Sequence, residues 1–269
     1  MEIDLKGQVA VVTGGGRGVG RAIAQSLGRA GAAVAVVGRT TSEIDATAAL
    51  VRDGGAMATA VAADVTDRVA VQNAADVIEH RLGPVTILVN NAGTCSAIGP
   101  VWEVDPHEWR QDLETSVLGA FFFTHALLTG MVKRRAGRIV NVSSYAAIRQ
   151  TPHMAAYGCS KAALLHLTNS LAAETAAHGV AVFAITPGRV QTAMTEYMFE
   201  SSAGRRWLDS GIHDWLSPER AGELSVFLAS GRADSLSGRF IHVLDNVHEL
   251  VRRSKEIQQD DLYVLRLRK

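Results

Sequence analysis

Three side chains in this 269-residue sequence could together handle a proton at a carbonyl oxygen. Tyr157 and Lys161 stand four positions apart in an Ala- and Leu-rich run, residues 155–177, whose apolar spacing predicts a helix. Positions i and i+4 share one helix face, so the phenol and the ammonium should project the same way. A free phenol has a pKa of about 10, and a neighbouring ammonium stabilises the phenolate and lowers that pKa. The pair could therefore act as a general acid or base.

Ser144 would complete such a site. It lies thirteen residues before Tyr157 and follows residues 138–142, an apolar run that reads as a buried strand. A strand end that brings this hydroxyl beside the phenol would offer a carbonyl oxygen two hydrogen-bond donors. The Tyr-x-x-x-Lys spacing alone also fits a helix with a half-buried tyrosine and a solvated lysine, so the other motifs must decide between the two interpretations.

A glycine-rich turn lies between a strand and a helix near the start of the chain. The turn, Thr13-Gly-Gly-Gly-Arg-Gly-Val-Gly20, follows a β-branched run at residues 8–13 and precedes a helical pattern at residues 21–30. Glycines let the backbone approach a pyrophosphate, and a helix N-terminus offers N–H groups and the positive end of its dipole. The turn therefore predicts a dinucleotide site, although its spacing is not G-x-G-x-x-G and a tight βα connection would look similar.

The end of the second predicted strand, residues 33–38, bears on the choice of dinucleotide. An acid at this position would bind the 2′-hydroxyl of NAD. Here Arg39 follows the strand and no acid occurs before Glu43. Arg39 could receive the 2′-phosphate of NADP, with Arg17 of the glycine turn beside it, so NADP(H) is expected over NAD(H). A solvated loop arginine is the alternative.

The remaining chain alternates strands with helices. Further strands are predicted at residues 57–63, 86–90, 138–142, 180–186 and 239–244, and further helices at residues 67–81, 106–135, 155–177 and 218–230. Such alternation favours a single doubly wound α/β domain with a parallel sheet. The turn Asn90-Asn-Ala-Gly93 suits close approach to a cofactor, although a plain loop would read the same way.

Two segments follow the sixth predicted strand. Residues 193–216 are rich in Met and aromatic side chains and predict a substrate lid, with a pair of packed helices as the alternative. Residues 247–257 have rough helical spacing, and residues 262–267 look like an extended apolar strip. We therefore divide the chain into a Rossmann domain, residues 1–246, and an extension, residues 247–269, that packs on the body or on a neighbouring subunit.

Composition excludes several classes of partner. Lys plus Arg and Asp plus Glu both number 27, so no strong field favours nucleic acid or an anionic membrane. The apolar runs look strand-sized, and the N-terminus lacks the pattern of a signal peptide. The two cysteines, Cys95 and Cys159, have no metal or redox spacing, and Cys159 is interpreted as a packing residue. A soluble, cytoplasmic protein with free thiols and no metal is expected.

Together these motifs resemble the short-chain dehydrogenase/reductase family over residues 5 to about 243. The matching segments are Thr13–Gly20, Asp64, Asn90–Gly93, Asn141–Ser144, Tyr157-x-x-x-Lys161 and Pro187-Gly-x-Val-x-Thr192. The resemblance implies a Rossmann fold with a seven-stranded parallel sheet, helices on both faces, and hydride transfer between a nicotinamide and a carbonyl or alcohol. Tyr157 would be the acid or base, Lys161 would bind the nicotinamide ribose, and Ser144 would hold the substrate oxygen.

The resemblance also implies a homodimer or homotetramer, and it implies a cofactor site. The cofactor-binding residues would be Thr13, Gly14, Gly16, Arg17, Gly18, Val19, Gly20, Arg39, Asp64, Val65, Asn91, Ala92, Gly93, Tyr157, Lys161, Pro187, Gly188, Val190 and Thr192. The substrate, a small carbonyl or alcohol, would meet Ser144, Met194 and His153, although His153 could equally be a loop residue.

Two departures from the family pattern stand out. Ser116 occupies the place of an Asn that helps hold a water beside the catalytic lysine, and residues 241–246 replace the usual strand end before the extension. Ser116 is nevertheless counted with the catalytic residues. The first departure keeps open a second function, a cofactor-binding sensor or scaffold without turnover. Epimerisation or dehalogenation are further uses of the fold, and the intact Pro187-Gly188 disfavours the latter.

Overall fold

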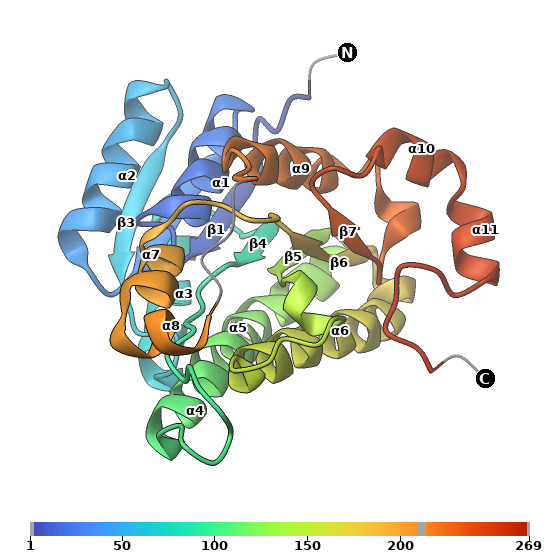
Figure 1. Ribbon diagram of the computed structural model, residues 1–269. Helices are drawn as coiled ribbons and strands as arrows, with labels where there is room; N and C mark the ends of the chain where they lie inside the picture. Colours follow the sequence, from blue (N-terminus) through green and yellow to red (C-terminus); the bar gives the residue numbers. More distant parts are fainter. Residues whose placement is uncertain (1–2, 209–213, 268–269) are drawn as a thin grey trace.

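The computed structural model describes residues 3–208 and 214–267. Seven parallel strands form one sheet in the order β3-β2-β1-β4-β5-β6-β7 (Figure 1). Their bounds are β1 Val9–Thr13, β2 Ala33–Gly38, β3 Ala58–Ala62, β4 Ile87–Asn90, β5 Gly137–Val142, β6 Val180–Thr186 and β7 Phe240–His242. The strand order reverses between β1 and β4, which is the point where ligands bind in open α/β sheets.

Helices cover both faces of this sheet, so the predicted doubly wound α/β fold with seven parallel strands is confirmed. One face packs against α1 (Gly18–Arg29), α2 (Thr41–Asp53) and α9 (Glu219–Ala229), with Ile23, Leu27 and Ile44 in its core. The other face packs against α3 (Arg68–Leu82), α5 (Gly119–Arg134) and α6 (Ala155–Thr175), with Phe123, Leu127 and Ile78 in its core. The strands are apolar nearly throughout because both faces are covered.

The helix predicted at residues 106–135 is present as Pro106–Arg134 and contains a π-helical turn. It consists of α4 (Pro106–Leu113), a π-helical turn (Glu114–Leu118) and α5. By length and composition alone, Pro106–Arg134 could cross a membrane, with a mean hydropathy of 1.5, which differs from the expectation of strand-sized apolar runs. A single helix of this kind is weak evidence for a span, and here Phe123, Leu127 and Met131 pack into the core beneath the sheet.

The segment expected as a lid contains two short helices, α7 (Ala193–Glu200) and α8 (Ser202–Trp207). Thr192 caps α7 by accepting a hydrogen bond from the backbone N–H of Thr195 at 3.3 Å. The paired helices agree with the alternative interpretation of this segment, and a lid role remains a prediction. Residues 209–213 of the expected lid lie outside the described residues.

The C-terminal residues lie beside β7, at the opposite edge of the sheet from β3 (Figure 1). Helices α10 (Val247–Arg252) and α11 (Ser254–Gln259) bury Leu250 and Ile257 in the same core as α1 and α9. The Tyr263 carbonyl accepts a hydrogen bond from the Phe240 N–H of β7 at 2.8 Å. Residues 260–267 contain no strand, so the expected extended strip at residues 262–267 is wrong, although one of its residues does meet the sheet edge.

Candidate active site

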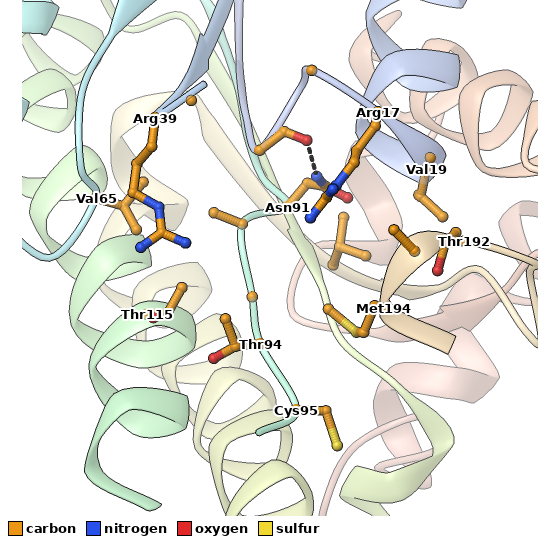
Figure 2. A pocket seen from close by; sticks show the side chains of 18 of the residues that line it. Arg17, Val19, Arg39, Val65, Asn91, Thr94, Cys95, Thr115, Thr192 and Met194 are labelled. Carbon is orange, nitrogen blue, oxygen red and sulfur yellow. Dashed lines mark hydrogen bonds between the residues drawn. The ribbon is translucent and has the colours of Figure 1, made fainter. Parts of the chain in front are cut away.

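A pocket of about 440 Å³ runs along the carboxyl ends of the central strands. Figure 2 shows Arg17 and Arg39 at one end of it and Thr94, Cys95 and Met194 at the other. Of the predicted site residues, those lining the pocket are Gly14, Gly16, Arg17, Gly18, Val19, Arg39, Asp64, Val65, Asn91, Ala92, Gly93, Tyr157, Lys161, Pro187, Thr192 and Met194. The structure thus brings together most residues of a site predicted from six separate motifs.

Seven predicted residues do not line this pocket: Thr13, Gly20, Ser116, Ser144, His153, Gly188 and Val190. Some of them hold its walls in place. The Thr13 hydroxyl accepts the Asn91 N–H at 3.0 Å, while the Asn91 amide donates to the carbonyls of Thr13 and Gly14 at 2.9 and 3.1 Å. These bonds tie the glycine turn after β1 to the segment after β4.

The glycines of the turn are required by space as well as by backbone angle. Gly14 has φ of +60°, and a Cβ there would lie 3.0 Å from the Ala92 Cα. A Cβ at Gly20 would lie 2.3 Å from the Gly14 carbonyl oxygen, closer than atoms can approach. The turn therefore keeps the start of α1 bare, which is the cradle that a pyrophosphate needs at a helix N-terminus.

Both arginines at the far end of the pocket already have acidic partners. Arg17 Nη1 lies 3.3 Å from Glu43 Oε1, and Arg39 Nη1 lies 3.7 Å from Asp64 Oδ2. Burial raises the pKa of Asp64, but hydrogen bonds from Thr66 and the Arg39 charge outweigh it, so this pKa lies below its usual value. All four side chains are partly exposed, so the pairs are weak and a ligand can displace them.

Lys161 and Tyr157 meet as their spacing predicts. Both lie in α6, and Lys161 Nζ is 5.6 Å from the centroid of the Tyr157 ring and donates to the Val142 carbonyl of β5 at 3.0 Å. Burial raises the pKa of Tyr157 to about 12, outweighing a hydrogen bond from the Ser144 side chain that lowers it. The expected fall of this pKa toward neutrality is therefore wrong for the free protein. Burial also lowers the pKa of Lys161, to about 8.

Ser116 faces Lys161 from the π-helical turn. Its side chain is buried, and its hydroxyl has no hydrogen-bond partner in the described protein. A Cβ built on Gly93 would lie 3.2 Å from Ser116 Oγ and 3.1 Å from Lys161 Nζ, so both groups converge on the bare Cα of Gly93. A buried hydroxyl without a partner beside an ammonium is a place for a water molecule or a ligand oxygen.

An apolar cluster adjoins the pocket beside Tyr157, and three of its members, Cys95, Tyr157 and Met194, line the pocket. The cluster consists of Cys95, Ile98, Met154, Tyr157, Met194, Met198, Phe199, Ala203, Trp207 and Leu208. The His153 ring stacks on Trp207 with centroids 4.9 Å apart, and His153 has φ of +68°. Its buried Nδ1 has no hydrogen-bond partner among residues 3–208 and 214–267. Met194 thus reaches the pocket, whereas His153 supports the α8 end of its wall.

The burial of Asp112 and the structural role of Asn141 were not predicted from the sequence. Asp112 is fully buried and accepts the backbone N–H groups of Ser96 and Ala97. Asn141 links β5 to Asn90 of β4 at 2.9 Å and to Thr168 of α6 at 2.8 Å. An acid on the inward face of a helix, four residues before Ser116, was the available signal for Asp112. Cys159 is exposed, so its interpretation as a packing residue is wrong.

Comparison with known proteins identifies this arrangement. The family model described as short chain dehydrogenase matches residues 8–203, which include the glycine turn, Ser144, Tyr157 and Lys161. The protein is a short-chain dehydrogenase. The match ends before α9, β7 and the C-terminal helices, although the relatives described next extend further.

This short-chain dehydrogenase is similar to proteins with several different substrates. It is 36% identical to 2-(S)-hydroxypropyl-CoM dehydrogenase 3 of Xanthobacter autotrophicus over 240 residues, 87% of this chain and 94% of the relative. The structure of a gluconate 5-dehydrogenase from Burkholderia cenocepacia J2315 with NADP and tartrate is 29% identical, with TM-score 0.81 over 92% of this chain and 98% of that one. An NAD⁺-bound xylitol dehydrogenase is 27% identical, with TM-score 0.82 over 88% and 97%.

Proposed function

We propose that this short-chain dehydrogenase transfers a hydride between NADP(H) and a carbonyl or secondary alcohol, acting as a ketone reductase or, in reverse, an alcohol dehydrogenase. The placement of Tyr157 and Lys161 in the wall of the pocket that begins at the glycine turn, with the Ser144 side chain hydrogen-bonded to Tyr157, carries the proposal. Bound nicotinamide would supply or accept the hydride. The bare glycine turn and the unpartnered Ser116 hydroxyl fit a site that awaits a ligand and its ordered water.

The protein's own residues would handle the proton. In reduction, Ser144 and Tyr157 bind the carbonyl oxygen, and Tyr157 donates its proton as charge develops there. Lys161 binds ribose hydroxyls, stabilises the resulting phenolate and returns a proton to it. Oxidation of the alcohol runs the same steps backwards, with the phenolate as base. The high pKa of Tyr157 in the free protein suits an acid that must stay protonated before substrate binds.

NADP(H) is proposed over NAD(H) because Arg17 and Arg39 flank the adenosine end of the pocket. A 2′-phosphate would replace weak, exposed ion pairs with charge-assisted hydrogen bonds from two guanidinium groups. The gluconate 5-dehydrogenase relative contains NADP whereas the xylitol dehydrogenase relative contains NAD⁺, so the family alone does not decide between the two.

The substrate is proposed to be apolar where it meets the wall beyond Tyr157. Cys95 and Met194 line this part of the pocket, and Met198, Phe199 and Trp207 belong to the apolar cluster that packs with them. Such a surface stabilises hydrocarbon or ring groups and offers few partners to a sugar-like polyol. Tyr197 at the rim provides one hydroxyl.

A panel of ketones and alcohols tests the proposal, with nicotinamide absorbance followed for NADPH, NADH and both oxidised forms. Turnover of a ring-bearing ketone with NADPH, faster than turnover of a polyol with NADP⁺, is expected. Tight NADPH binding without turnover of any carbonyl or alcohol would instead support a cofactor-binding sensor or scaffold.

A further inference from the structure

Asp112 presents an electrostatic problem that the proposed proton chemistry leaves unexplained. Within residues 3–208 and 214–267, the buried charged side chains are Asp112, Lys161 and Arg239, with 0%, 3% and 8% exposure. Arg239 lies next to β7 at the edge of the sheet. A buried charge is strongly unfavourable unless hydrogen bonds and an opposite charge compensate it. Asp112 therefore needs a partner, and Lys161 is the candidate near the catalytic site.

Hydrogen bonds compensate Asp112 in part and fix its position. Both carboxylate oxygens accept the Ser96 N–H, at 2.9 and 3.0 Å, and one also accepts the Ala97 N–H at 3.2 Å. Ser96 and its neighbour Cys95 line the pocket, so the carboxylate stands directly behind the pocket wall. These bonds come from neutral donors and leave the negative charge itself unmatched.

The position of Cys95 relates Asp112 to Lys161. Burial, and secondly the Asp112 charge, raise the pKa of the Cys95 thiol to about 12, while the Lys161 charge lowers it in part. The thiol therefore lies within reach of both charges. In addition, α4, which carries Asp112, contacts α6, which carries Lys161 and Tyr157. The carboxylate and the ammonium thus flank one small buried region.

We propose that Asp112 is a positioning residue that provides the counter-charge for the buried Lys161 ammonium and holds the Cys95–Ala97 wall of the pocket. The carboxylate keeps Lys161 charged, so that the lysine can bind the ribose and return a proton to Tyr157. It also disfavours phenolate before substrate arrives. Lys161 donates to the Val142 carbonyl of β5 and has Ser116 and the Tyr157 ring beside it. The titratable groups whose charges act on Lys161 are Asp112 from α4 and Cys95 from the segment after β4.

The sign of the pH effect follows from these surroundings. Burial lowers the pKa of Lys161 and Asp112 raises it, while burial and Asp112 both raise the pKa of Tyr157. Reduction needs the protonated form of both groups, so its rate falls as pH rises past their coupled pKa values. Loss of the Asp112 charge lowers both pKa values and must move this fall to lower pH.

The Asp112→Asn variant tests the charge by the pH profile of kcat/KM for ketone reduction. We expect the alkaline fall to move down by about one pH unit, the size of one nearby charge. Asp105→Asn is the matched control, because Asp105 is exposed in the N-cap of the same helix and Asn caps equally well. A profile in which Asp112→Asn has a lower rate but an unchanged midpoint pH would overturn the proposal, because a purely structural role predicts that result.

A second measurement does not depend on turnover, and so separates this inference from the proposed function on which its pH readout rests. Unfolding by urea is compared for wild type, Asp112→Asn, Lys161→Met and the double variant. If the charges compensate each other, each single variant leaves one buried charge without its partner. The free energy of unfolding of the double variant is then higher than the sum of the two single losses predicts. Additive losses, or a double variant that fails to fold, would overturn the pairing.

Discussion

Lys161 can return a proton to Tyr157 only if a proton reaches it from solvent. The lysine is buried, and its described hydrogen bond goes to the Val142 carbonyl. Ser116 and Lys161 approach the same side of the Gly93 Cα, and the Ser116 hydroxyl has no hydrogen-bond partner among the described residues. This hydroxyl can bind a water if two further polar groups also bind that water. We propose that the proton relay passes through such a water, with Ser in the place of a longer Asn.

The Ser116→Ala variant should therefore be slower. We expect the turnover number to fall about fivefold, the rate equivalent of one hydrogen bond worth about 1 kcal/mol, with little change in NADPH affinity. Ser116→Asn should keep or raise turnover, because its amide reaches further and offers both donors and an acceptor. Steady-state kinetics check both variants. A Ser116→Ala enzyme as fast as wild type would mean that protons reach Lys161 by another route.

The choice of dinucleotide should depend on Glu43 as well as on Arg39. Glu43 holds Arg17 at 3.3 Å and would stand as a negative charge beside a 2′-phosphate. Glu43→Gln should tighten NADPH binding, because it removes this negative charge, and should leave NADH binding unchanged, because NADH has no 2′-phosphate. The gain should be several-fold, since an exposed ion pair is worth at most about 1 kcal/mol. Arg39→Asp should reverse the preference for NADPH.

Fluorescence titration with each reduced dinucleotide measures these affinities without turnover. Asp45→Asn is the matched control for Glu43→Gln, since Asp45 is an exposed acid in the same helix. Wild-type protein that binds NADH as tightly as NADPH would contradict the proposed preference. Equal gains in NADPH affinity from Glu43→Gln and Asp45→Asn would show that the affinity responds to net charge and not to the local charge of Glu43.

At the scale of elements, the C-terminal helices belong to the core that carries α1 and α9. Leu250 and Ile257 are 4% and 0% exposed, and Phe227 of α9 contacts the His248 ring of α10 edge-on at 4.7 Å. These helices cover one end of the sheet, where β7 would otherwise present an open edge. We infer that the extension stabilises the fold beside β7 and lies on the body of its own chain.

Truncation of one buried side chain in this extension measures that contribution. Ile257→Ala should reduce the free energy of unfolding by about 2–5 kcal/mol, the usual loss for a fully buried Ile. Leu267→Ala is the control, because Leu267 is 86% exposed. Urea unfolding compares the two, and equal, small effects would mean that the extension is dispensable for stability.

The strands and most of the residues that line the pocket could be predicted from the sequence because they depend on local patterns. A β-branched run followed by a glycine turn fixes β1 and α1, and the i, i+4 spacing of Tyr157 and Lys161 survives in any helix. The contact of the π-helical turn at Ser116 with α6, and the hydrogen bonds of Asp112 to Ser96 and Ala97, join parts of the chain that are distant in sequence, so no local pattern reports them. The pKa of Tyr157 was misjudged for the same reason, because desolvation arises only in the folded protein.

At the scale of the whole molecule, some apolar surface remains uncovered on α3 and α5. Val69 and Val77 of α3 are 66% and 37% exposed, and Leu118 and Phe121 at the start of α5 are 42% and 45% exposed. Val69, Phe121 and Phe122 also line a shallow hollow between the two helices. An apolar face of this kind is typical of an interface, and supports the proposal that the protein is a homodimer or homotetramer.

Light scattering at micromolar concentration should therefore give the mass of two or four chains. Phe121→Asp should lower that mass, since it places a charge in the apolar face, whereas Trp102→Asp, at an 84% exposed residue of another surface segment, should not. A wild-type protein that scatters as a monomer would contradict the proposed assembly.

The central claim is that hydride transfer in this protein depends on Tyr157 as the acid or base at the substrate oxygen. Its most direct test is a single-turnover measurement of NADPH absorbance with the best ketone from the panel, for wild type and Tyr157→Phe. The phenyl ring fills the same space but has no proton to give. Absorbance should fall in wild type and stay constant in Tyr157→Phe, while both proteins bind NADPH with similar affinity. Appreciable NADPH consumption by Tyr157→Phe would contradict the account.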